Sequence, residues 1–172
     1  MNNSDSKWSG AAKDGLLLSL VTIVVITLQM LTGSSFLNML LWTIKTVGSL
    51  WILTIFMKKS ALLRPGESPF GYGFRVCLCS SAVIAVYNLL LYGFLFPNYA
   101  TEAIESAMRV ISTASIPNYD EFSTMMAKVE DNYAQIQCVS TFLWCTFFGL
   151  IASAIAGSSI SRRKDIFEDG QI

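Results

Sequence analysis

The stretch from Phe36 to Met57 constrains the fold more than any other part of the sequence. It is an apolar run long enough to cross a bilayer, because about 20 apolar residues in a helix match a hydrocarbon core of about 30 Å. One charged residue, Lys45, lies near the middle of the run. A charge at that depth costs at least ~2.5 kcal/mol on insertion scales. The run therefore predicts a transmembrane helix whose lysine is compensated by groups on other helices.

Three further apolar runs of similar length complete the pattern. With the first they predict spans at residues 15–33, 36–57, 74–96 and 136–160. Only 14% of the residues are charged, whereas a soluble domain carries about 25%. We therefore expect an all-α membrane protein that forms a single membrane domain over residues 1–172. The net charge is zero, which argues against nucleic acid as a partner because phosphate backbones are bound by excess Lys and Arg.

The residue types that usually hold metals or carry acid–base chemistry are sparse. The sequence contains no histidine. The four cysteines are Cys77, Cys79, Cys138 and Cys145. Two are expected near the start of the third span and two in the outer half of the fourth, so they should not converge as a zinc site would require. We expect no metal, no cofactor and no catalytic residue.

The segment 98–135 is the longest part of the chain outside the four spans. Apolar residues recur at helical spacing in its two halves, which predicts amphipathic helices at about 99–114 and 119–135. Pro117 should separate them, and we expect the second helix to continue unbroken into the fourth span. The pair forms a helical hairpin between the third and fourth spans.

The distribution of Lys and Arg predicts the orientation in the membrane, because basic residues favour the cytoplasmic side. The N-terminal tail, the 58–75 loop and the C-terminal tail together hold nine, whereas segment 98–135 holds two against six acidic residues. Both termini should be cytoplasmic and the hairpin extracytoplasmic. We expect a multi-pass protein of the bacterial inner (cytoplasmic) membrane.

Small residues in the fourth span form a stripe at four-residue steps: Gly149, Ser153 and Gly157. Small residues let helix backbones approach closely in lipid. The stripe indicates a helix-packing face, used either within a four-helix bundle or between two copies of the chain. The sequence leaves these alternatives open.

Lys45 is the one candidate for a polar or anion-binding site in the bundle. Asn88 and Tyr92 of the third span should lie in the same outer half of the membrane, as should Gln29 and Thr141. Lys45 is then either a structural lysine held by hydrogen bonds or snorkelling to the interface, or a site for an anion or lipid phosphate. Direct acid–base chemistry is the weakest interpretation.

Three features carry a resemblance to a known family: a Ser-Pro-Phe-Gly-type turn before the third span (Ser68 to Phe74), Pro97 at its end, and the amphipathic outer segment. The chain resembles an uncharacterised four-span inner-membrane family of Bacteroidota, catalogued as domain of unknown function 4199. The resemblance implies no catalytic residues. It also implies an association with a family-two glycosyltransferase similar to polyprenyl-phosphate sugar synthases.

Two classes of function remain from the sequence, with an integral-membrane enzyme as a weaker third. The first is a non-catalytic accessory or scaffold subunit for a membrane-associated enzyme, such as that glycosyltransferase. Its partner could instead be a second copy of the chain, in a homo-oligomer. The alternative is a small transporter, channel or lipid-binding protein that uses Lys45. A solute path would normally need helices broken at mid-membrane or more intramembrane charge, and the sequence offers neither.

Overall fold

The computed structural model describes residues 3–32, 34–64, 66–112 and 119–168, and its elements are all helical. In chain order these are α1 (Asn3–Leu31), α2 (Ser35–Leu63), α3 (Pro69–Leu90), the π-helical turn η1 (Leu91–Leu95), α4 (Asn98–Ser112), α5 (Tyr119–Asp131) and α6 (Tyr133–Glu168). The expected all-α fold is confirmed.

Four helices are long and apolar enough to cross a membrane. The candidate spans are Trp8–Leu31, Ser35–Leu63, Pro69–Leu95 and Tyr133–Ser161, so the expected number of spans is confirmed. All four spans are longer than the sequence indicates, because a helix continues into polar residues that an apolar run excludes. α1, for example, begins at Asn3 rather than near residue 15.

The start of α3 corrects the prediction of a turn from Ser68 to Phe74. Pro69 is the first residue of the helix, a position where proline is favoured because its missing N–H has no intrahelical partner anyway. The Ser68 hydroxyl accepts a 3.5 Å hydrogen bond from the Gly71 amide, and the Ser68 carbonyl accepts one of 3.1 Å from the Tyr72 amide. Ser68 therefore caps α3, and the turn precedes it.

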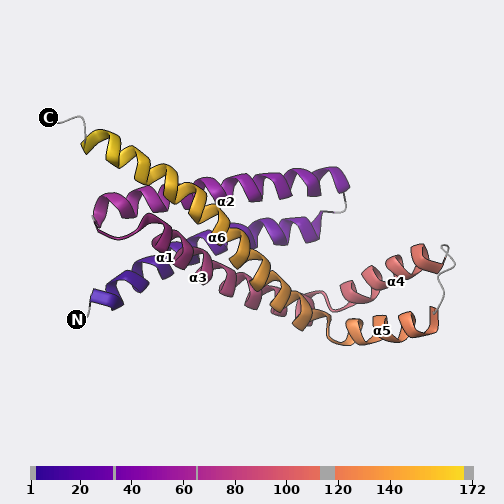
Figure 1. Ribbon diagram of the computed structural model, residues 1–172. Coiled ribbons are helices and arrows are strands. Elements are labelled where there is room, and N and C mark those ends of the chain that lie inside the picture. The colour runs from indigo at the N-terminus through magenta and orange to yellow at the C-terminus, as the bar shows by residue number, and fades with distance from the viewer. Residues whose placement is uncertain (1–2, 33, 65, 113–118, 169–172) are drawn as a thin grey trace. The chain divides into compact units, whose positions relative to one another are not determined.

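The chain divides into two compact units, residues 1–84 with 142–172, and residues 85–141. In the first unit, α1 and α2 lie side by side as an antiparallel hairpin (Figure 1). The Gln29 side-chain amide donates a 3.1 Å hydrogen bond to the Asn38 carbonyl, which ties the two helices together at their connection. The core of this unit is the buried cluster Ala11, Leu18, Leu53, Met57, Tyr72, Val76 and Cys77.

The second unit contains the hairpin of α4 and α5, which lie side by side (Figure 1). A 2.6 Å hydrogen bond from the Thr101 hydroxyl to the Glu130 carboxylate joins the two helices. At the base of the hairpin the rings of Tyr92, Tyr99 and Tyr133 contact one another, with centroids 5.4–6.4 Å apart. Pro117, expected to separate the two helices, lies outside the described residues.

The junction between α5 and α6 differs from the expected continuous helix. α5 ends at Asp131, Asn132 forms a turn, and α6 begins at Tyr133. The Asn132 side-chain amide donates a 3.0 Å hydrogen bond to the Lys128 carbonyl. Asn side chains that bond the backbone locally compete with helix continuation. The prediction of one unbroken helix through residue 136 is therefore wrong.

Candidate functional site

Lys45 lies in the middle of α2, and its side chain is half-buried. The ammonium is close enough to Cys145 on α6 for the two groups to interact electrostatically. No carboxylate among the described side chains forms an ion pair with Lys45. Among the described residues of its own unit, Lys45 therefore has no ion-pair partner.

The other residues predicted to surround Lys45 have partners of their own. The Asn88 amide donates a 2.9 Å hydrogen bond to the Thr141 hydroxyl, which links α3 to α6 within the second unit. The Asn88 side-chain oxygen is buried and has no hydrogen-bond partner among the described residues. Tyr92 belongs to the tyrosine cluster, and Gln29 is bound at the α1–α2 connection. A direct contact between Lys45 and Asn88 or Tyr92 stays a prediction.

The small residues of the fourth span contact α3 inside the first unit. A Cβ atom added to Gly149 would lie 2.5 Å from the Cβ of Cys77, and one added to Gly157 would lie 3.1 Å from the Phe70 nitrogen. Ser153 is fully buried, and its hydroxyl lies 3.9 Å from the Cys77 sulfur. This stripe is therefore occupied by a helix of the same chain.

A cluster of charged and aromatic groups, which the sequence reasoning did not identify as a unit, lies where α2 and α3 meet α1. The Glu67 carboxylate accepts hydrogen bonds from Arg75 and, at 3.4 Å, from Arg64. Its side chain is only 6% exposed. The Arg75 guanidinium also lies 5.7 Å from the ring centre of Trp8. We call these four residues the Glu67 cluster.

A second polar contact in the same unit joins α3 to α1. The Tyr72 hydroxyl donates a 2.5 Å hydrogen bond to the Asp14 carboxylate.

The sequence does contain a signal for the Glu67 cluster, since Glu67 is the only acidic residue between Lys58 and Arg75. The count of basic residues that predicts topology does not detect Glu67, because that count ignores isolated acidic residues.

These contacts hold helices together and present no arrangement of nucleophile, base and orienting group. Within the described ranges, no group of three or more His, Cys, Asp or Glu side chains could hold a metal ion. The four cysteines are free thiols. The chemistry available in the described part of the chain is hydrogen bonding and ion pairing between helices.

Four membrane-length helices packed through small and polar residues define a multi-pass helical membrane protein. The chain belongs to the family described as "Protein of unknown function (DUF4199)", whose model matches residues 13–162. No curated protein and no solved structure matches the chain significantly.

Proposed function

We propose that the protein is a non-catalytic accessory or scaffold subunit of the bacterial inner membrane, with both termini cytoplasmic. Its partner would be a membrane-associated enzyme, such as a polyprenyl-phosphate-type glycosyltransferase. The observation that carries this proposal is the α4–α5 hairpin, a pair of helices outside the four spans whose apolar faces are incompletely covered.

The hairpin has the features of a docking element. Ile104 and Met108 of α4, and Phe122 and Met126 of α5, are only half-buried. Met125 is 60% exposed. Aromatic residues and methionine are enriched in the centres of protein interfaces. An adaptable methionine beside a half-covered apolar seam is suited to packing against another protein.

The proposal is tested by affinity purification of the tagged full chain from native membranes in a mild detergent. We expect a glycosyltransferase to co-purify in constant proportion. The substitution Met125→Glu should reduce its recovery at least fivefold, because a buried charge would replace the methionine at the interface. Ala127→Glu is the matched control, since Ala127 is exposed on the same helix but points away from residue 125. Equal recovery with both variants, or the absence of any partner, would reject the proposal.

One observation favours the alternative of an anion- or lipid-binding protein or a small transporter: Lys45 forms no ion pair with any carboxylate that the structure describes. If Lys45 holds an anion, Lys45→Met should abolish binding of that anion while the protein remains folded. If Lys45 is structural, the same change should leave binding intact and thermal stability in detergent unchanged or raised. Binding of radiolabelled phosphate or of phospholipid to the two proteins distinguishes these outcomes.

A further inference from the structure

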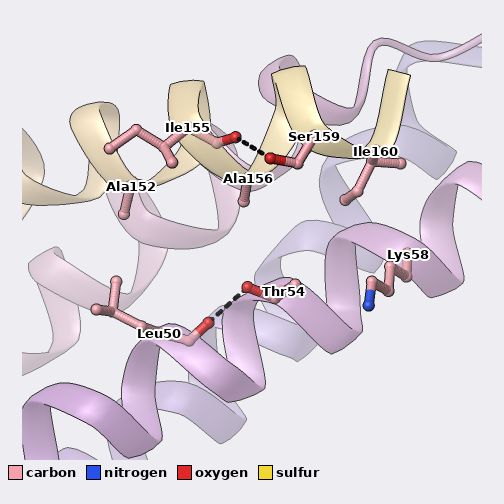
Figure 2. A pocket seen from close by; sticks show the side chains of 8 residues that line it. All are labelled: Leu50, Thr54, Lys58, Ala152, Ile155, Ala156, Ser159 and Ile160. Atoms are coloured by element: carbon pink, nitrogen blue, oxygen red, sulfur yellow. Dashed lines mark hydrogen bonds between the residues drawn. The ribbon is translucent and has the colours of Figure 1, made fainter. Parts of the chain in front are cut away.

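A groove of about 460 Å³ lies between α2 and α6 in the first unit. Figure 2 shows α2 contributing Leu50, Thr54 and Lys58, and α6 contributing residues that include Ala152, Ala156 and Ser159. Its volume is within the range of about 300–1,000 Å³ that is usual for ligand sites. The alanines leave the space open because neither carries a side chain beyond Cβ.

The groove is apolar along most of its length and has one charged group. The Thr54 hydroxyl donates a 2.8 Å hydrogen bond to the Leu50 carbonyl, and the Ser159 hydroxyl donates one of 3.1 Å to the Ile155 carbonyl (Figure 2). Both hydroxyls are therefore already engaged with their own helices. Lys58 is exposed and pairs with no carboxylate among the described side chains. The ammonium is the group that remains to bind a ligand.

The lining of the groove changes along its length, from apolar residues at one end to Lys58 at the other. From Leu50 to Lys58 the helix rises about 12 Å, at 1.5 Å per residue. One leaflet of a bilayer has a hydrocarbon thickness of about 15 Å, half of a core of about 30 Å. α6 runs alongside in the same direction, from Ala152 to Ile160 (Figure 2). The apolar part of the groove is therefore nearly as long as one leaflet is thick, and Lys58 lies at one end of it.

We propose that this groove binds an anionic glycerophospholipid, with one acyl chain along Leu50 and Ala152 and its phosphate at Lys58. Charge complementarity selects the occupant, because the one charged side chain that lines the groove, Lys58, is a cation. Basic residues at the membrane surface attract anionic headgroups. The residues that line the groove include neither Lys45 nor any residue of the α4–α5 hairpin, so this proposal does not depend on the function proposed above.

The charge is tested by native mass spectrometry of the full chain titrated with phosphatidylglycerol or with phosphatidylcholine of the same acyl chains. We expect the wild type to prefer phosphatidylglycerol, and Lys58→Gln to reduce that preference about fivefold, which corresponds to about 1 kcal/mol per basic residue. Lys59→Gln is the control, because Lys59 is exposed but does not line the groove. Equal losses for the two variants would overturn the proposal in favour of diffuse attraction to the membrane surface.

The acyl-chain site is tested by filling the groove. Ala156→Leu should reduce retention of both lipids, whereas Ala154→Leu should not, because Ala154 is exposed and does not line the groove. Ala156 also packs against the core, so circular dichroism must show that the variant folds. If it does not fold, the comparison of Lys58→Gln with Lys59→Gln tests the proposal. A dimer that forms in the absence of lipid and dissociates in Ala156→Leu would instead assign the groove to a second copy of the chain.

Discussion

At the scale of single residues, Glu67 and Glu105 make ion pairs in contrasting surroundings. The Glu67 side chain is 6% exposed between Arg64 and Arg75, whereas the Glu105 side chain is 62% exposed and lies 3.7 Å from Arg109. Hydrogen bonds to charged groups contribute about 1.5–3 kcal/mol when they are shielded from water. Exposed ion pairs on a helix contribute about 0.3–0.5 kcal/mol. The Glu67 cluster should therefore hold α2, α3 and α1 together.

The first prediction follows from this contrast. Glu67→Gln should lower the free energy of unfolding by about 1.5–3 kcal/mol, because the amide replaces the carboxylate between two arginines. Glu105→Gln makes the same chemical change at an exposed pair and should lower it by less than about 0.5 kcal/mol. Thermal unfolding of both variants in the same detergent measures the difference. Similar shifts for the two would mean that the Glu67 carboxylate is held no more firmly than a surface group.

At the scale of helices, α3 and α6 approach each other through glycine. The Cβ of an alanine at Gly149 would lie 2.5 Å from the Cβ and 2.9 Å from the sulfur of Cys77, whereas one at Gly48 in α2 would meet nothing within 4 Å. Overpacking a tight contact costs about 1–3 kcal/mol. Alanine in an open helix position is more favourable than glycine by about 0.5–1 kcal/mol.

Gly149→Ala should therefore destabilise the protein, and Gly48→Ala should leave its stability unchanged or raise it. Melting temperatures in detergent, followed by circular dichroism, test the pair of variants. A melting temperature for Gly149→Ala equal to that of Gly48→Ala would contradict the close approach of α3 and α6.

The helices themselves could be predicted from the sequence, but several of their ends could not. Runs of about 20 apolar residues are a strong signal because the bilayer requires that length. Pro69 was assigned to a turn, although proline is equally suited to the first turn of a helix. At the break, the Asn132 side chain donates a hydrogen bond to the Lys128 carbonyl, a local bond that competes with helix continuation. Neither the hydrophobic periodicity nor the composition of the segment predicts that this bond forms.

At the scale of the whole molecule, the sequence indicated which residues are polar at membrane depth but not which would pair. Asn88 and Thr141 were both expected in the outer half of the bundle, and they bond to each other. Gln29 instead binds the α1–α2 connection. Pairing depends on helix rotation as well as depth, and depth is all that residue position along a span provides. Glu67 was missed because the count of basic residues that predicts topology ignores isolated acids, although both of its ion-pair partners, Arg64 and Arg75, are close to it in the sequence.

The orientation of the molecule in the membrane is the last prediction. Nine of the twelve Lys and Arg residues lie in residues 1–14, 58–75 and 161–172, so both termini and the connection between α2 and α3 should face the cytoplasm. The α4–α5 hairpin should then face the outside. Leu62 is 83% exposed at the end of α2, and Glu121 is exposed on α5. Leu62→Cys and Glu121→Cys therefore place one thiol on each side of the membrane.

A membrane-impermeant maleimide should label Glu121→Cys in intact cells whose outer membrane has been permeabilised, and should label Leu62→Cys only after lysis. The unsubstituted chain is the control, because its four free cysteines all lie in the candidate spans. Labelling of Leu62→Cys before lysis would reverse the orientation. It would also place Lys58 and its groove in the outer leaflet, so that the lipid bound there would have to come from that leaflet. The same experiment therefore determines which leaflet supplies the anionic lipid.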